Sequence, residues 1–64
     1  MPTTEQQIAE AEAAAERATA LADEYFRAYR LHDWMAMNSA ATSFYVAADK
    51  LRRDAALSRA GEAA

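Results

Sequence analysis

The chain has no cysteine, and among its 64 residues it has one glycine, one proline and one histidine. Without cysteine it can form neither a disulfide framework nor a cysteine-ligated zinc site. One glycine and one proline are too few for the many turns of a multi-stranded β fold. The sequence also has no apolar run long enough to cross a membrane, and its first residues lack the basic and apolar segments of a signal peptide. We therefore expect a cytoplasmic protein.

Large apolar side chains are scarce as well. Apolar residues make up 53% of the chain, but 19 of them are alanine and only 15 are larger. So small a supply cannot enclose a deep pocket, and it stabilises an isolated monomer poorly. We expect a single domain spanning residues 1–64 that is not an enzyme, binds no metal and uses no cofactor.

The charges that are present are unevenly distributed. The net charge is −3, yet residues 1–24 carry six acids and one base, whereas residues 25–64 carry six bases and four acids. A negative total disfavours nucleic-acid binding by the chain as a whole. Six of the seven basic residues are arginine, which together with abundant alanine is typical of GC-rich coding DNA and suggests a bacterial, phage or plasmid source.

The first half of the chain has the periodicity of a helix. Uncharged residues recur at spacings of three and four, namely Ile8, Ala11, Ala15, Ala18, Ala22, Tyr25 and Tyr29. This pattern predicts a helix over about 5–31. Threonines at positions 3 and 4 stand three residues before glutamines at positions 6 and 7, which is the spacing of a capping box at the start of a helix.

A second periodic segment predicts a helix over about 34–58. Its uncharged positions are Trp34, Met37, Ala41, Phe44, Ala48, Leu51 and Ala55. Opposite charges stand four residues apart on its outer side, in the pairs Asp49 with Arg53 and Lys50 with Asp54. Gly61 is a natural stop for this helix. We expect residues 1–4 and 60–64 to be frayed termini.

The two periodic segments are out of phase by five residues between Tyr29 and Trp34. The phase jump predicts a turn at 31–33, with Asp33 as the N-cap of the second helix. No glycine or proline marks this turn, so a single continuous helix and a second break at Asn38–Ser39 are the alternatives.

The predicted fold is all-α: an antiparallel two-helix hairpin whose alanine-rich faces pack closely. Folding the chain at 32–33 places large residues opposite small ones and brings Glu12 beside Arg53. Because many larger side chains miss this contact, we predict that two hairpins associate into a four-helix bundle.

Aromatic residues and arginines gather near the predicted turn. One interpretation is a core cluster in which Tyr25, Tyr29 and Trp34 face inward. The other is an interaction surface, because such residues dominate protein interfaces. The residues predicted to contact a second copy or a partner protein are Phe26, Arg27, Arg30, Leu31, Trp34, Met35, Tyr45, Val46 and Leu57.

Two polar groups on the second helix carry weaker signals. Lys50, Arg52, Arg53 and Arg59 form a basic cluster that could contact phosphates. The small polar residues Asn38, Ser39, Thr42 and Ser43 could let another helix approach, or they could simply be solvated. His32 beside Asp33 is at most half a metal site, and we interpret it as a solvated turn residue.

These patterns favour a non-enzymatic protein–protein interaction module. We expect a small accessory or regulatory protein that docks on a partner protein and modulates or masks it. A dimeric nucleic-acid-binding regulator that uses the basic half of the second helix is the first alternative, and a structural subunit of a larger assembly is the second.

Overall fold

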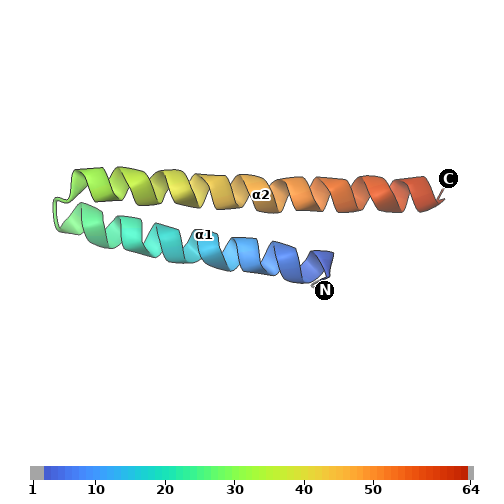
Figure 1. Ribbon diagram of the computed structural model, residues 1–64, viewed down its shortest axis with the longest axis horizontal. Coiled ribbons are helices and arrows are strands. Elements are labelled where there is room, and N and C mark those ends of the chain that lie inside the picture. Colours follow the sequence, from blue (N-terminus) through green and yellow to red (C-terminus); the bar gives the residue numbers. More distant parts are fainter. Residues whose placement is uncertain (1–2, 64) are drawn as a thin grey trace.

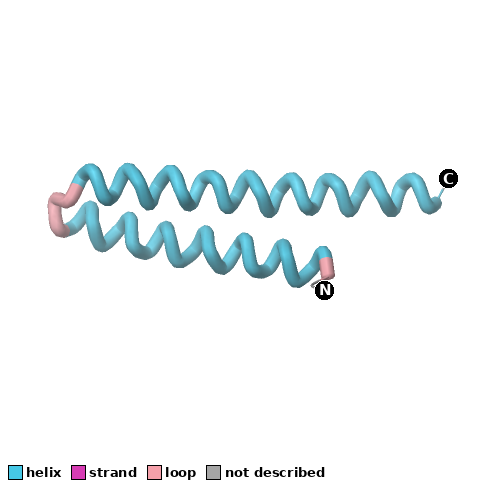
Figure 2. Tube along the Cα trace, viewed as in Figure 1, coloured by secondary structure: helices cyan, strands magenta, loops and turns pink. Residues whose placement is uncertain are grey.

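The computed structural model describes residues 3–63. They form two helices, α1 (Thr4–Arg27) and α2 (Leu31–Ala63), which are joined by a short turn. The helices run antiparallel and side by side in a rod with extents of 53 × 18 × 14 Å (Figures 1 and 2). No strand occurs within the described part of the chain. The predicted all-α hairpin is therefore confirmed, and the single continuous helix is excluded.

The helix boundaries differ from those that the sequence suggested. The turn comprises residues 28–30 rather than 31–33, so α1 is shorter than expected and α2 begins earlier. No second break interrupts α2, which continues past Ser58 and Gly61 and extends beyond the start of α1 (Figure 1). The predictions that concern Met1, Pro2 and Ala64 lie outside the described residues.

The start of α1 is confirmed as a capping box. The side-chain oxygen of Thr3 accepts a hydrogen bond of 3.1 Å from the backbone N–H of Gln6. In return, the backbone N–H of Thr3 donates to Oε1 of Gln6 at 2.8 Å. These two bonds satisfy backbone donors that would otherwise lack partners in the first turn, and they explain why the helix begins at Thr4.

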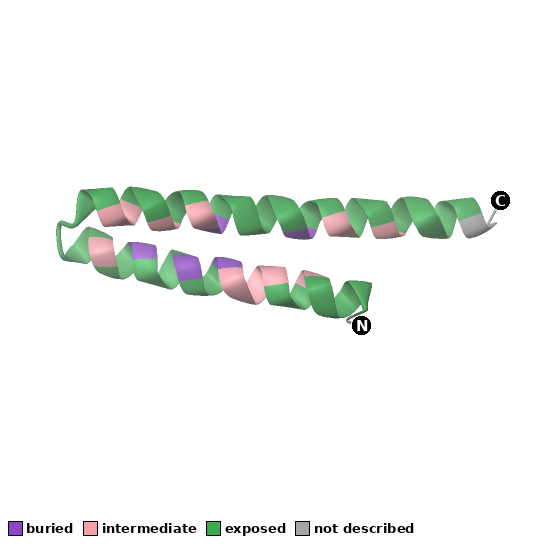
Figure 3. Ribbon diagram, in the orientation of Figure 1, coloured by how far each residue is buried: buried purple, intermediate pink, exposed green. Residues whose placement is uncertain are grey.

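Among the residues whose burial the structure describes, the buried core consists only of alanine. Figure 3 shows the buried positions on the facing sides of the two helices, and they are Ala15, Ala18, Ala22, Ala41 and Ala48. They repeat at intervals of three, four or seven residues, as in the contact line of a coiled coil. Because each side chain is a single methyl group, the two backbones can approach closely where these alanines meet.

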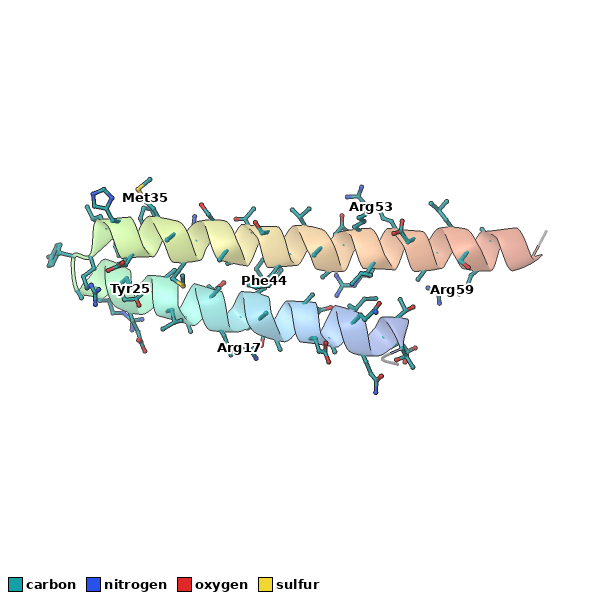
Figure 4. The ribbon with its side chains drawn as sticks, viewed as in Figure 1. Arg17, Tyr25, Met35, Phe44, Arg53 and Arg59 are labelled. Atoms are coloured by element: carbon teal, nitrogen blue, oxygen red, sulfur yellow. The ribbon has the colours of Figure 1, made fainter. Side chains whose placement is uncertain are left out.

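Among the described residues, no large apolar side chain is fully buried between the helices. Phe44 lies on the side of α2 that faces α1 (Figure 4), yet it is 40% exposed. Leu21 of α1 is 41% exposed. The interlocking of large with small residues that the sequence suggested at most levels therefore covers Phe44 only in part.

Within the described part of the chain, one ion pair links the two helices. The carboxylate of Glu12 on α1 contacts the guanidinium of Arg52 on α2. The sequence suggested Arg53 as the partner, but Arg53 instead pairs with Asp49 within α2, as the four-residue spacing predicted. Both pairs are exposed, so each adds little stability, and the main effect of the Glu12–Arg52 pair is to fix the alignment of the helices.

Substitutions at two adjacent alanines test the close contact between α1 and α2. Ala48 is fully buried, whereas Ala47 is exposed. We expect Ala48→Leu to lower the free energy of unfolding by about 1–3 kcal/mol, because the added atoms push the helices apart. Ala47→Leu should change it by less than about 0.5 kcal/mol. Urea unfolding followed by circular dichroism measures both values, and equal effects at the two positions would contradict the alanine-only core.

Candidate interaction surface

The turn between the helices is a Schellman motif built without glycine. The backbone N–H of Arg30 donates to the carbonyl of Tyr25 at 2.8 Å, and that of Tyr29 donates to the carbonyl of Phe26 at 3.1 Å. These bonds satisfy two of the last carbonyls of α1. The motif requires a left-handed residue, and Tyr29 supplies it with a φ of 58°. Glycine is the usual residue at this position, because a Cβ atom makes the conformation costly.

Arg30 connects the two helices at this turn. Its guanidinium lies 4.9 Å from the centre of the Tyr25 ring, within the range of a cation–π contact. It also forms an ion pair of 2.6 Å with Asp33. Its carbonyl accepts the first helical hydrogen bond of α2, from the N–H of Trp34 at 2.9 Å. Arg30 therefore occupies the start of α2, and the prediction that Asp33 is the N-cap is wrong. Asp33 lies in the first helical turn, where a negative charge is also favourable.

Tyr29 points into solvent and contributes almost nothing to the fold. Its side chain is 89% exposed, so its predicted place on the inward face of the first helix is wrong. The reason is that α1 ends at Arg27, and the helical periodicity no longer applies two residues later. An exposed aromatic side chain on a strained backbone is expensive for stability, and strain of this kind tends to occur at functional positions.

Other apolar side chains surround Tyr29. Phe26, Arg27, Tyr29 and Leu31 line a shallow hollow of about 390 Å³, and we call this group the turn-end surface. Phe26 and Leu31 are both more than half exposed. The ring of Phe26 also rests against that of half-buried Trp34, with 5.5 Å between the ring centres. This contact holds Phe26 in place at the edge of the surface.

The outer side of α2 is a second exposed surface, and it carries no charge over a long stretch. Residues 34–48 contain no acidic or basic side chain. Figure 4 shows Met35 directed away from α1. We call the exposed residues of this stretch that point away from the α1 contact the charge-free face; they are Met35, Ala36, Asn38, Ser39, Thr42, Ser43, Tyr45 and Val46. Leu57 is exposed too, but it lies outside this stretch and is surrounded by charged residues.

The basic cluster of α2 is partly neutralised by its neighbours. Arg52 pairs with Glu12, and Arg53 pairs with Asp49. The guanidinium of Arg59 donates a long hydrogen bond of 3.4 Å to the carbonyl of Ala55. Lys50 is exposed. The acidic side chains of both helices thus reduce the positive charge that the cluster would offer to phosphates.

A second hollow, which we did not anticipate from the sequence, lies where the helices diverge toward the start of α1 (Figure 1). It measures about 450 Å³ and is lined by Thr4, Glu5, Ile8, Arg52, Ala55, Ser58 and Arg59. Its walls are mixed in charge, and no single ligand chemistry follows from them.

Within residues 3–63, no three His, Asp or Glu side chains gather where they could hold a metal ion. Neither helix there combines the length and apolar character that crossing a membrane requires. A comparison of the chain with protein-family models, curated proteins and solved structures finds no match.

The strain at Tyr29 predicts a stabilising substitution. We expect Tyr29→Gly to raise the free energy of unfolding by about 1 kcal/mol, because glycine adopts the left-handed conformation without steric cost. Tyr29→Ala is the control: it removes the ring but keeps the Cβ atom, so the strain persists. Thermal and urea unfolding compare the variants. A glycine variant that is no more stable than the alanine variant would show that the backbone at residue 29 is not strained.

Proposed function

We propose that this protein is a non-enzymatic interaction module that self-associates and docks on a partner protein, which it modulates or masks. The observation that carries this proposal is the distribution of its apolar side chains. Between residues 3 and 61, every fully buried residue is an alanine, whereas nine larger apolar side chains are substantially exposed. Contiguous exposed apolar surface on a small protein is typical of an interface.

The size of the exposed surface supports self-association. The accessible surface of the chain is 5086 Å². A compact monomer of 7.0 kDa is expected to expose about 4,000 Å². The excess of about 1,000 Å² is comparable to the roughly 800 Å² that each partner buries in a standard protein–protein interface. A dimer of two hairpins, and thus a four-helix assembly, would remove this excess.

The turn-end surface supports docking on a different protein. Tyr29 keeps a strained backbone without contributing to the core, and it stands beside Phe26 and Leu31 around a shallow hollow. Aromatic side chains and arginine are the residues that contribute most at interfaces, and Arg27 lines the same hollow. We therefore assign partner recognition to this end of the hairpin. The nucleic-acid alternative has weaker support, since Arg52 and Arg53 already face carboxylates.

Self-association is tested by the mass of the protein in solution. At micromolar concentration we expect a mass of about 14 kDa or more, rather than 7.0 kDa, because association buries the exposed apolar surface. Sedimentation equilibrium measures it, and unfolding midpoints that rise with protein concentration provide an independent check. A cooperatively folded species that sediments as a monomer at all concentrations would refute self-association.

Partner docking is tested with Tyr29→Gly, which we expect to fold and to be more stable than the parent. We expect immobilised parent protein to retain at least one protein from an extract of its source, and the glycine variant to retain much less of it. The matched control is Ala20→Gly, which changes an exposed position on the outer side of α1. Equal retention by the parent and by both variants would exclude the turn end as the docking surface.

A further inference from the structure

The charge-free face of α2 has a composition that solvent exposure does not explain. Charged residues make up 27% of the chain, yet fifteen consecutive residues, 34–48, contain none. The outer side of α1 shows the opposite pattern, because it carries acidic and basic residues along its length. Solvated helix surfaces are normally rich in charge, whereas the centres of interfaces are depleted of it.

The polar side chains of this face can be covered at little cost. The hydroxyl of Thr42 donates to the carbonyl of Asn38 at 3.1 Å within the same helix. Its hydrogen-bonding capacity is therefore partly satisfied without water, and its methyl group is free to pack. Ser39 and Ser43 are small enough to let another helix approach. Met35 stands at one end of the face, and Tyr45 and Val46 stand at the other, so apolar side chains flank a centre of small ones.

We propose that this face binds the same face of a second copy of the chain, with the two α2 helices antiparallel about a twofold axis near residues 40 and 41. The inference rests on the self-association proposed above and specifies its geometry. The occupant is a second copy because the surplus of about 1,000 Å² matches the area that each partner buries in a standard dimer. A twofold axis at the centre of the face also makes the surface complementary to itself, as an isologous interface requires.

Charges at the two ends of the face favour the antiparallel orientation. In this arrangement Asp49 of one copy comes to the level of His32 of the other, and Lys50 comes to the level of Leu31, so like charges are kept apart. A parallel arrangement would instead align Asp49 with Asp49 and Lys50 with Lys50. Juxtaposed like charges are unfavourable, so the orientation follows from the same residues that delimit the face. Apolar Met35 of one copy then meets Val46 of the other.

Two matched substitutions test which surface is used. Val46 and Leu57 are both exposed apolar residues of α2, at 62% and 71% exposure. Val46 lies in the proposed interface, whereas Leu57 lies beyond the level at which α2 of the other copy begins. We expect Val46→Glu to weaken dimerisation by about tenfold or more, because it places a charge in the contact, and Leu57→Glu to change it by less than about twofold. Sedimentation equilibrium measures both, and equal effects would overturn the proposal.

Spin labels placed beyond residues 34–48 test the geometry and leave the residues of the charge-free face unchanged. The chain has no native cysteine, so Lys50→Cys and Gly61→Cys each introduce a single attachment site. No atom lies within 4 Å of a Cβ built at Gly61, so a side chain fits there. With a rise of 1.5 Å per residue, labels on the two copies should be separated along the axis by about 30 Å at residue 50 and about 60 Å at residue 61.

Pulsed electron–electron dipolar spectroscopy distinguishes the outcomes. Distances near the two expected values support the antiparallel arrangement. Similar short distances at both positions, in a protein that sediments as a dimer, would overturn this geometry and leave self-association intact. A parent protein that sediments as a monomer would refute self-association itself, and this inference with it. The two failures are therefore distinguishable.

Discussion

The close contact between alanine residues of the two helices is the constraint on which the remaining structure depends. Methyl groups at Ala15, Ala18, Ala22, Ala41 and Ala48 allow the backbones to approach closely. Larger side chains beside this contact are not fully covered, and Phe44 and Leu21 remain partly in solvent. A core of single methyl groups supplies little burial free energy. The apolar surface that could supply more is thereby displaced to the outside of the hairpin.

The turn is a second place where the isolated chain is less stable than it could be. A Schellman motif with glycine would satisfy the end of α1 without strain, yet the chain places Tyr29 there. Arg30 offsets part of this strain. Its backbone N–H donates to Tyr25 of α1, and its carbonyl accepts from Trp34 of α2. Its guanidinium contacts the Tyr25 ring and the carboxylate of Asp33. The ring of Tyr29 itself remains in solvent. Both the alanine contact and the turn therefore point to requirements outside the isolated chain.

Most of the fold was predictable from the sequence, because periodicity and capping are local properties. The capping box at Thr3 and Gln6 and the inward positions of the buried alanines follow from spacing alone. A turn was predicted at 31–33, but its true position at 28–30 did not follow from the spacing. Tyr29 continues the spacing of the first helix, and a left-handed position filled by tyrosine has no signature that can be recognised without its backbone angles. The prediction that Asp33 is the N-cap failed as well, since an acidic residue is favourable both at an N-cap and in the first helical turn.

The candidate surfaces were predictable only in part. Exposure of Phe26, Leu31, Met35, Tyr45, Val46 and Leu57 follows from their positions off the helix–helix contact. The sequence suggested Arg53 as the partner of Glu12 across the hairpin, whereas the structure shows Arg52. The two arginines are adjacent in sequence and differ only in which side of the helix they occupy. The absence of charge between residues 34 and 48 was visible in the sequence, but its meaning depends on knowing that half of these residues face away from α1.

These features together connect the stability of the chain to its association. An isolated hairpin exposes about 1,000 Å² more surface than a compact protein of its mass, and its buried contacts are small. In the proposed dimer, the free energy of the interface adds to that of folding, so the folded fraction depends on protein concentration. The charge-free face would then act chiefly in assembly, and the turn-end surface of each copy in docking. Because the two turns lie on opposite sides of the twofold axis, one dimer would present two copies of this surface, and a partner with two matching sites would gain affinity from binding both at once.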